Sequence, residues 1–519
     1  MKHTIKQSQK KSQKKFYLPA MTALATLLLA GCAVGPDFSR PAAPAVNGYT
    51  PEPLMTQTAS APVAGGEAQR FVSAADIPAQ WWTLFHSTAL NSLIEQALKN
   101  NPSLQQAEAA LRVAQETVYA QQGAYYPSVS ANFTPTRQKE ALGSVSSSAA
   151  SGASLFNLHT AQLNVSYTAD VFGGNRRQVE SLQAQSDSQR FQLEAAYLTL
   201  TSNVVAAAVQ EASLRAQIAA ANTMIKVEQE QLNLFRRQLE LGAVAEANVL
   251  AQVAALAQTQ ALLPPLQKQL AQQRDLLTAL AGGFPGDVSS NVSGNASSNA
   301  SHNAAPEQFE LSMLQLPQDL PVSLPSKLVE QRPDVRSAEE QLHAASALVG
   351  VAKANMLPQF TLSAAGGSMA TQIGQLFKSG NGFWTLAGGI TQPLFEGGAL
   401  LHKKRAAEAA YDEAAAQYRG TVIAAFQNVA DTLQALQFDA DGLQAAVIAE
   451  RAAADSLAIA RRQVELGDIG YVSLLAAEQA YQQAVLTLVQ AQANRYADTA
   501  ALFQALGGGW WNRDDVASR

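Results

Sequence analysis

Two long stretches of the chain carry an apolar residue at every seventh position. The first, from 175 to 241, contains no proline and no glycine, and one acid interrupts its series: Tyr197, Val204, Glu211, Ile218, Ile225, Leu232 and Leu239. The same register 225 residues later reads Val422, Val429, Leu436, Leu443, Glu450, Leu457 and Val464. A heptad sustained in this way predicts long helices in coiled-coil packing. At about 1.5 Å per residue such helices reach roughly 100 Å, far more than a compact globular domain needs.

Shorter segments alternate apolar with polar residues, which is the period of a half-buried strand. Their apolar positions are Val129, Ala131 and Phe133; Leu163, Val165, Tyr167, Ala169 and Val171; and Phe360, Leu362 and Ala364. A less regular segment runs from Phe383 to Leu394. The pattern therefore predicts four strands per chain, each of about ten residues.

The sequence repeats itself once, which is a signature to be sought early. Residues Asn101-Pro102, Ala107-Glu108 and Tyr126-Pro127 recur as Arg332-Pro333, Ala338-Glu339 and Leu357-Pro358, and Gly173-Gly174 recurs as Gly397-Gly398. The run from Arg236 to Gly242 recurs from Arg461 to Gly467. In each copy the sequence pattern predicts a helix, two strands, a very long helix, a glycine turn and another long helix. The copies span 76–284 and 325–507, with a linker at 285–324, a surface loop around 141–154 and a tail at 508–519.

Four strands of about ten residues match tilted transmembrane strands, yet they cannot close alone, because single-chain barrels start at about eight. Open sheet edges are not tolerated in lipid, so several chains must share one barrel. Three chains of four strands give a 12-stranded barrel. We therefore expect a mixed α and β, mainly α, trimer with an outer-membrane β-barrel continuous with a periplasmic α-helical barrel of coiled-coil hairpins. A long helical bundle or coiled-coil spacer would explain the helices alone, but not the strands.

The first 31 residues read as a secretory signal, with six lysines, no acid and an apolar run from Phe16 to Ala30. The run ends in Leu29-Ala30-Gly31-Cys32, a lipobox that predicts a covalent lipid on the only cysteine of the chain. An ordinary buried cysteine is the alternative. Residues 32–75 then predict an extended tether. By resemblance to Gram-negative lipoproteins, Ala33 in place of an acid points to the outer membrane.

The net charge argues against a nucleic acid partner, and the hydropathy pattern argues against a transmembrane helix. Without the signal, the count of basic minus acidic residues is (36 − 6) − 41, or −11, so we expect no nucleic acid partner. After the signal there is no uninterrupted apolar run of about 18 residues, so we expect no transmembrane helix. With one cysteine there is no intrachain disulfide, and stability must come from packing and assembly.

With these features the sequence resembles the TolC-like outer membrane factors, in particular the lipoprotein branch of resistance-nodulation-division efflux systems, the NodT type. The resemblance rests also on two segments: Ala33 to Phe38, and Trp81-Trp82-Thr83-Leu84-Phe85 followed by Leu90, Leu93, Ile94, Ala97-Leu98 and Asn101. It implies a homotrimeric passive exit duct for drugs or other small toxic compounds. Its partners would be a periplasmic membrane-fusion adaptor, an inner-membrane transporter and outer membrane lipid. The alternatives are a duct for type I protein secretion and a nonconducting envelope spacer.

The sequence offers no constellation for enzyme chemistry, and we expect no cofactor or metal beyond the lipid on Cys32. The six histidines have no metal-ligand spacing, and no phosphate-binding glycine loop follows a strand. The clusters Gly282-Gly283 and Gly507-Gly508-Gly509 follow long helices and are expected to terminate them. Trp510 and Trp511 either pack near the middle of the duct or mark a tail.

Gly242 and Gly467 interrupt the coiled-coil hairpins at the end farthest from the strands, which the resemblance assigns to the periplasmic tip. Family members close this mouth with acids, but the matching positions here are Asn248, Ser473 and Ala476, which puts that ring in doubt. Candidate replacements are Glu246 and Asp468, with Arg461 or Arg462 pairing to a neighbouring chain. The resemblance assigns adaptor docking to the turns and to Arg236, Glu240, Arg461 and Glu465. Ordinary solvated surface charges are the alternative.

Overall fold

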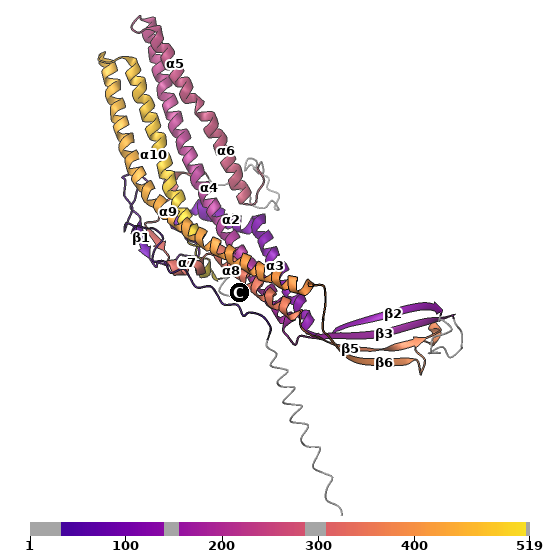
Figure 1. The fold of residues 1–519 in the computed structure, drawn as a ribbon. Helices are drawn as coiled ribbons and strands as arrows, with labels where there is room; N and C mark the ends of the chain where they lie inside the picture. The colour runs from indigo at the N-terminus through magenta and orange to yellow at the C-terminus, as the bar shows by residue number, and fades with distance from the viewer. Residues whose placement is uncertain (1–32, 140–154, 286–307, 515–519) are drawn as a thin grey trace, which may run out of the picture. The chain divides into compact units, whose positions relative to one another are not determined.

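The computed structural model describes residues 33–139, 155–285 and 308–514. The signal segment with Cys32, the loop around 141–154 and most of the linker lie outside the described residues. The elements, most of whose α-helices and strands are labelled in Figure 1, are β1 (Arg70–Ser73), η1 (Trp81–Phe85), α2 (Thr88–Asn100), α3 (Pro102–Gln122), η2 (Gly123–Tyr125), β2 (Ser128–Lys139), β3 (Leu155–Ala169), α4 (Gly174–Glu240), α5 (Glu246–Ala261), α6 (Leu263–Leu280), η3 (Leu311–Met313), β4 (Asp319–Val322), α7 (Pro325–Gln331), α8 (Pro333–Ala354), β5 (Gln359–Ala370), η4 (Ile373–Gln375), β6 (Gly382–Thr391), α9 (Ala399–Leu466), α10 (Tyr471–Ala505) and η5 (Trp510–Asn512).

The chain divides into two compact units, and each unit takes segments from both sequence repeats. Unit 1 comprises residues 1–40, 112–188 and 338–418, and unit 2 comprises 41–111, 189–337 and 419–519. Helices α3, α4, α8 and α9 contribute residues to both units. The units therefore do not coincide with the duplicated segments, because elements of both copies pack together within each unit.

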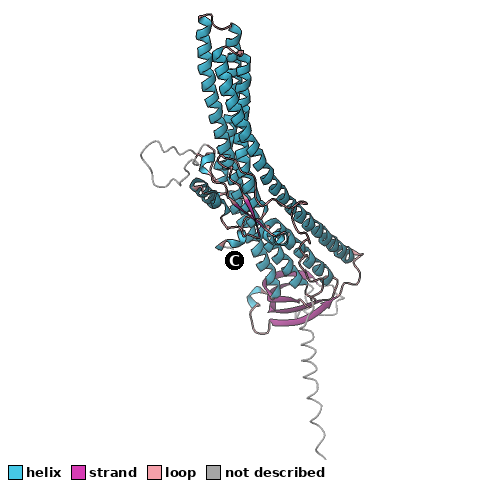
Figure 2. Ribbon diagram, turned by 90° about the vertical axis from the view of Figure 1, so that its left-hand side faces the viewer, coloured by secondary structure: helices cyan, strands magenta, loops and turns pink. Residues whose placement is uncertain are grey.

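Unit 1 holds an antiparallel sheet, whose strands are magenta in Figure 2, with the strand order β2-β3-β5-β6. Its strands have 12, 15, 12 and 10 residues and lie at the four segments that alternate in the sequence. The hairpin of the first copy joins that of the second through β3 and β5, with Ala169 opposite Phe360. The prediction of four strands in this sheet is confirmed.

Two further strands were not expected. In unit 2, β1 and β4 pair in parallel, with Arg70 opposite Asp319, and the side chains of these two residues form an ion pair at 2.7 Å. The strands lie in stretches that the sequence analysis assigned to tether and linker. Four residues are too few to produce a readable alternation, although pairing them satisfies backbone groups that would otherwise need water.

The long helices lie where the heptads predict them, since α4 spans 174–240 and α9 spans 399–466. Most heptad positions in unit 2 are buried, including Val204, Val429 and Leu436. The interrupting Glu211 is buried too, and it accepts two hydrogen bonds from Arg215, at 2.8 and 2.7 Å. A break in the heptad is thus filled by an intrahelical ion pair.

Prolines divide three helices that the sequence analysis treated as single. Each copy opens with two helices, because Pro102 starts α3 and Pro333 starts α8. The preceding Asn101 adopts an extended backbone with ψ 123°, as residues before proline prefer. In the first copy the second long helix is also interrupted, at Leu262, because Pro264 and Pro265 cannot donate the hydrogen bonds of a continuing helix. Its counterpart α10 continues unbroken for 35 residues.

The aromatic segment at the start of the body forms the core of unit 2. Trp81, Trp82 and Phe85 are buried in η1, and Trp81 stacks on Phe503 with ring centroids 5.3 Å apart. Trp510 packs edge-on against Phe191, with 5.7 Å between ring centroids. Of the two readings of the C-terminal tryptophans, packing is therefore the one observed.

One helical stretch of the described residues, Glu246–Leu280, is long and apolar enough to cross a membrane by length and composition. The sequence analysis counted uninterrupted apolar runs, of which this stretch has none of that length, and its mean hydropathy is high because many alanines and leucines outweigh the interspersed glutamines. The absence of a transmembrane helix therefore stays a prediction. Length and composition do not separate a membrane span from a packed helix. Val249 and Leu256 of this stretch are buried inside unit 2.

Candidate functional site

The four-stranded sheet has one apolar and one polar face. Strand register places large apolar side chains on the same face of neighbouring strands, with Phe360 opposite Ile390 and Ala364 opposite Leu386. The large apolar residues of this face that are exposed are Val129, Phe133, Leu155, Leu163, Leu362, Trp384, Leu386 and Ile390. The opposite face carries mainly hydroxyls and amides: Ser128, Ser130, Asn132, Thr134, Thr160, Gln162, Asn164, Ser166, Thr361, Ser363 and Thr385. Apolar residues on that face lie near the hairpin ends, at Phe156, Leu158, Met369 and Phe383. A sheet of this kind suits a boundary between lipid and water.

Both outer strands of this sheet, β2 and β6, lack a partner on one side within the described residues. Their outward N–H and C=O groups need hydrogen bonds that neither water nor lipid would supply inside a bilayer. Exposed edges of this length are also templates for pairing with another chain. The sheet is thus complete only if further strands join it.

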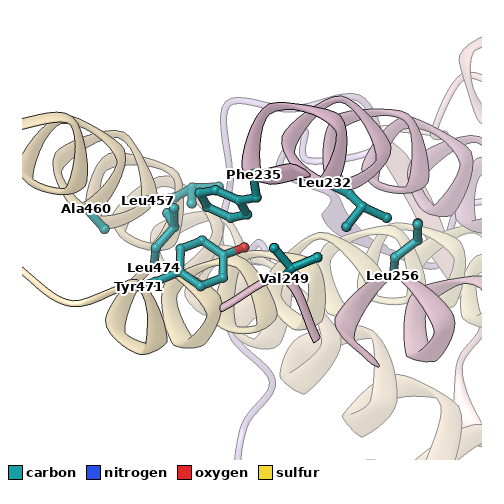
Figure 3. Packing of buried hydrophobic residues seen from close by; sticks show 8 residues of the cluster. All are labelled: Leu232, Phe235, Val249, Leu256, Leu457, Ala460, Tyr471 and Leu474. Atoms are coloured by element: carbon teal, nitrogen blue, oxygen red, sulfur yellow. The ribbon is translucent and has the colours of Figure 1, made fainter. Parts of the chain in front are cut away.

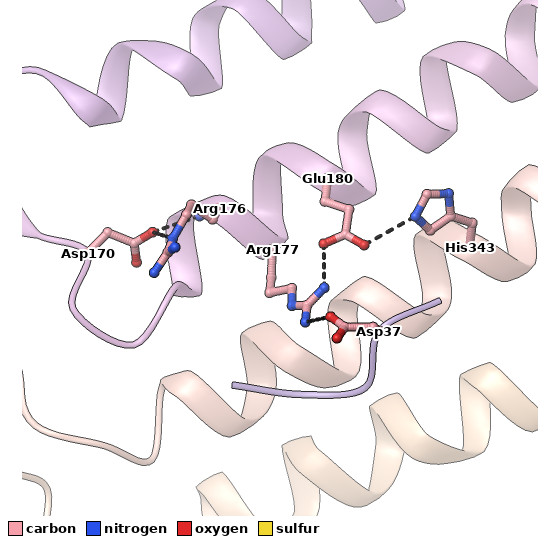
Figure 4. A network of polar contacts seen from close by, with 6 residues as sticks. All are labelled: Asp37, Asp170, Arg176, Arg177, Glu180 and His343. Atoms are coloured by element: carbon pink, nitrogen blue, oxygen red, sulfur yellow. Dashed lines mark hydrogen bonds and ion pairs between the residues drawn. The ribbon is translucent and has the colours of Figure 1, made fainter. Parts of the chain in front are cut away.

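The residues that follow Cys32 form a strap on unit 1, residues 33–40 (Figure 4). Its Asp37 accepts a hydrogen bond from Arg177 of α4, whose guanidinium also donates to Glu180 at 2.7 Å. Glu180 is in turn 3.1 Å from His343 Nε2, on α8. The Arg177 side chain is only 7% exposed, so this ion pair holds the strap at a buried point of the helix.

Two further contacts fix the strap along its length. Phe38 stacks on His343 with 4.4 Å between ring centroids, and Arg40 pairs with the buried Glu339. A Cβ placed on Gly35 would be 2.5 Å from Gly350 Cα, so the two backbones approach as closely as only glycines allow. The segment from Ala33 to Phe38, which contributed to the resemblance to the TolC-like family, is therefore a strap bound along unit 1.

Both hairpin turns in unit 2 are built in the same way. Gly242 has φ +72° and Gly467 has φ +78°, the left-handed conformation that favours glycine. The N–H of Gly467 donates to Val464 O at 3.1 Å, and that of Asp468 donates to Gln463 O at 2.9 Å. Equivalent bonds of 2.9 and 2.8 Å end α4. This pair of bonds is the Schellman motif, so the prediction that these glycines end the long helices is confirmed.

An apolar cluster holds the two hairpins together next to these turns. We call it the tip cluster; its members are Leu232, Phe235, Val249, Leu256, Leu457, Ala460, Tyr471 and Leu474 (Figure 3). They come from α4, α5, α9 and α10. Tyr471 meets Phe235 edge-on, with ring centroids 4.2 Å apart, and donates its hydroxyl to Gln252. The hairpin ends therefore form one packed body.

The structure brings the predicted tip residues to these turns, although their roles stay predictions. The charged ones are all exposed: Arg236, Glu240, Glu246, Arg461, Arg462, Glu465 and Asp468. Ser473 is exposed as well, and Asn248 is half-buried. Within the chain, Arg462 pairs with Glu465 at 3.1 Å, and Arg461 lies 3.7 Å from Glu478. Both arginines thus have a partner in their own chain.

Sequence reasoning missed two buried carboxyl groups below the tip cluster, Glu228 and Glu478, which are 7% and 8% exposed. Burial raises the pKa of Glu478 to about 7 against the opposing charge of Arg461, and it also raises the pKa of Glu228. A comparison of the two repeats could have identified these two residues. The equivalent positions 225 residues away are Ala453 and Val253, so an acid replaces a small apolar residue at each site.

A two-faced sheet with open edges, present in one chain with paired helical hairpins, suits a transport protein of the outer membrane. The sequence matches the outer membrane efflux protein family over residues 93–283 and 324–508, and the chain belongs to this family. It is therefore an outer membrane component of an efflux system and a transport protein.

Relatives of the chain include transport proteins with different cargo in their names. The toluene efflux pump outer membrane protein TtgC of Pseudomonas putida is 28% identical over 499 residues, covering 96% of this chain and 96% of the relative. The cation efflux system protein CusC of Escherichia coli is 27% identical over 503 residues, covering 95% and 98%. The solved structure of the outer membrane protein VceC from Vibrio cholerae is 28% identical, with a TM-score of 0.74, covering 84% of this chain and 100% of that one.

Proposed function

We propose that three copies of this chain assemble into a passive exit duct, with a 12-stranded barrel in the outer membrane and a helical barrel in the periplasm. The observation that carries the proposal is the sheet with one apolar face, one polar face and two unpaired edges. Pairing β6 of one chain with β2 of the next satisfies both edges and directs the apolar face to lipid. The polar face then lines a water-filled lumen, through which solutes pass without specific binding.

The lipid on Cys32 is the second part of the proposal. Cys32 lies outside the described residues, but the strap that follows it contacts unit 1 through Asp37 and Phe38. A lipid at the start of the strap would add a second attachment to the membrane beside the barrel. Myristoyl-length chains bind membranes only marginally on their own, so we expect the barrel to carry most of the attachment.

The third part concerns partners. The turns at Gly242 and Gly467, with the exposed charges around them, would dock the hairpins of a periplasmic adaptor, which connects the duct to an inner-membrane transporter. The transporter supplies the energy for export. The names of the relatives include toluene and cation efflux, and both uses suit a duct that does not select its cargo.

Single-channel recording tests the duct itself. The purified full chain in a planar bilayer should give discrete conductance steps, and its native mass in detergent should equal three chains. A single-chain mass with intact β signal would contradict the trimer, since four strands cannot close a barrel. A trimer without conductance under any applied voltage would favour the nonconducting spacer.

In-cell crosslinking tests the partners and separates export of small compounds from protein secretion. A photocrosslinker at Glu240 or Glu465 should capture an adaptor, and the transporter that copurifies with it identifies the pump. A matched crosslinker at Ile448, an exposed residue of α9 two turns or more from the hairpin end, controls for nonspecific capture. Equal capture at both positions would refute docking at the tip.

A further inference from the structure

A cavity of about 280 Å³ lies below the tip cluster, between α4, α5 and α10. Glu228 projects from α4 and Glu478 from α10, and both line this cavity. The rest of its wall is largely amide and hydroxyl: Gln258, Thr259, Gln479, Gln482 and Gln483. The seam between two otherwise apolar hairpins is thus polar at this level.

The carboxyl groups in the cavity have unused hydrogen-bonding capacity. Thr259 donates to Glu228 Oε1 at 2.9 Å, but Glu228 Oε2 has no hydrogen bond, and neither oxygen of Glu478 has one. The nearest cation is Arg461, whose guanidinium is 3.7 Å from Glu478 Oε1, too far for a hydrogen bond. Buried polar atoms without partners are costly, and a native chain that retains several in one place calls for an additional ligand.

The internal duplication argues against a packing role for these residues. In the repeat, Glu228 and Thr259 of the first hairpin correspond to Ala453 and Ala484 of the second, and Glu478 of the second corresponds to Val253 of the first. The long helices of both copies therefore form with small apolar side chains at these positions. Because hairpin formation does not require carboxyl groups here, their presence in one seam indicates a separate function.

We propose that this cavity binds one hydrated divalent cation between Glu228 and Glu478. Two carboxylates balance the charge of one such ion, and magnesium in proteins typically keeps several waters and one or two carboxylate ligands. The described residues contain no group of three or more acidic, histidine or cysteine side chains suited to a metal. The remaining coordination therefore comes from water, which the cavity has room for and which the surrounding glutamine amides can hydrogen-bond.

The bound cation acts as a clamp between the first and second hairpins. Glu228 belongs to the hairpin of α4 and α5, whereas Glu478 belongs to that of α9 and α10. Across the same seam Tyr471 of α10 donates to Gln252 of α5, and Gln252 in turn donates to Glu228 O at 3.0 Å within the first hairpin. An ion bound by both carboxylates adds a strong link between the two hairpins, and this link depends on the cation concentration of the surrounding solution. This site is independent of the cargo and of the number of chains in the duct.

Protons compete with the cation for the same oxygens. The titratable or charged groups around the cavity are Glu228 on α4, Arg461 on α9, and Tyr471 and Glu478 on α10. The residues that α5 places on the wall, Ala255, Gln258 and Thr259, carry no titratable group. A carboxyl group must lose its proton to ligate a cation, so the affinity should fall when either Glu228 or Glu478 is protonated.

Magnesium binding to the full chain in detergent tests the proposal by isothermal titration calorimetry. Wild type should bind one Mg²⁺ per chain, and E228Q/E478Q should lose affinity by more than about 100-fold, because even a neighbour of a metal ligand accounts for about 10- to 100-fold. The matched control E465Q removes an exposed carboxyl near the same turn and should bind like wild type. Hydrogen exchange at α10 should slow on addition of Mg²⁺ in wild type and E465Q only.

Two outcomes would overturn the proposal. One is equal Mg²⁺ binding by wild type and E228Q/E478Q, which would place the ion elsewhere on the protein or on bound lipid. The other is no Mg²⁺ binding by wild type at pH 8, which needs no variant and stands even if the double variant fails to assemble. Neither result bears on conductance or trimer mass, so the duct is tested separately.

Discussion

Replacing Gly467 by valine tests the hairpin turn most directly. The residue has φ +78°, and a Cβ built there meets no atom within 4 Å, so the cost is one of backbone strain and not of collision. A left-handed backbone costs about 1–2 kcal/mol for an L-residue with a side chain, and a β-branched one is a still rarer occupant. The chain can relieve that strain by giving up the two bonds donated by Gly467 and Asp468.

The strain is small beside the packing that surrounds it. Removing a single large aromatic side chain such as Phe235 from the tip cluster would cost about 3–5 kcal/mol, and the cluster has eight members. The turn should therefore rearrange while the hairpins stay packed. We expect Gly467→Val, and to a lesser degree Gly242→Val, to abolish export while trimers that resist heating in detergent remain in the outer membrane.

The assay is efflux in a host that lacks its own duct, read together with adaptor crosslinking and trimer content. Gly470→Val is the matched control, since Gly470 has φ −74° and ψ 152° and also faces open space. Asparagine tolerates the left-handed region, so Gly467→Asn should retain much of the activity. Normal export with normal crosslinking in the Gly242→Val/Gly467→Val double variant would refute the reasoning.

Three other results are expected. Mass spectrometry of the mature N-terminus should find a diacylglyceryl group on Cys32, and an unmodified cysteine would disprove lipidation. Arg177→Met should release the strap and make residues 33–40 sensitive to protease, whereas Arg176→Met, on the neighbouring exposed position, should leave them protected. The raised pKa of Glu478 means that, in divalent-free buffer, the folded state keeps a proton on this carboxyl between pH 4.5 and about 7, whereas the unfolded state loses it. The free energy of unfolding should therefore fall by up to about 3 kcal/mol as the pH rises through this range. Thermal unfolding should show this slope in wild type and a reduced one in Glu478→Gln; the same slope in both would disprove it.

Periodic features were readable from the sequence, because their signal lies within one element. The heptads from 197 to 239 and from 422 to 464 lie inside α4 and α9, and the stretch from 175 to 241 without proline or glycine matches α4 to within a residue. The alternating segments lie in the strands of the larger sheet. The glycines at 242 and 467 could be assigned because both copies carry them at the same helix end. Because of the duplication, the pattern that predicts each of these elements occurs twice in the sequence.

Contacts between distant residues were not readable in this way. Asp37 and Arg177 are 140 positions apart, and Glu228 and Glu478 belong to different copies, so no local pattern joins them. The prolines at 102 and 333 marked the repeat in the sequence, but the break that each of them causes between two helices was not predicted. Pro264 is different again, since it has no counterpart in the second copy and interrupts only one of two equivalent helices.

The strap sets where a lipid on Cys32 would enter the bilayer. Gly35 lies against Gly350, and a Cβ on Gly173 would touch Ala33, so the chain is held at the junction between the end of β3 and the start of α4. Cys32 is one residue further, a step of about 3.8 Å. Acyl chains on Cys32 would therefore enter the membrane close to the end of the sheet. They would help to hold this junction at the inner surface of the membrane and so fix the depth of the proposed barrel.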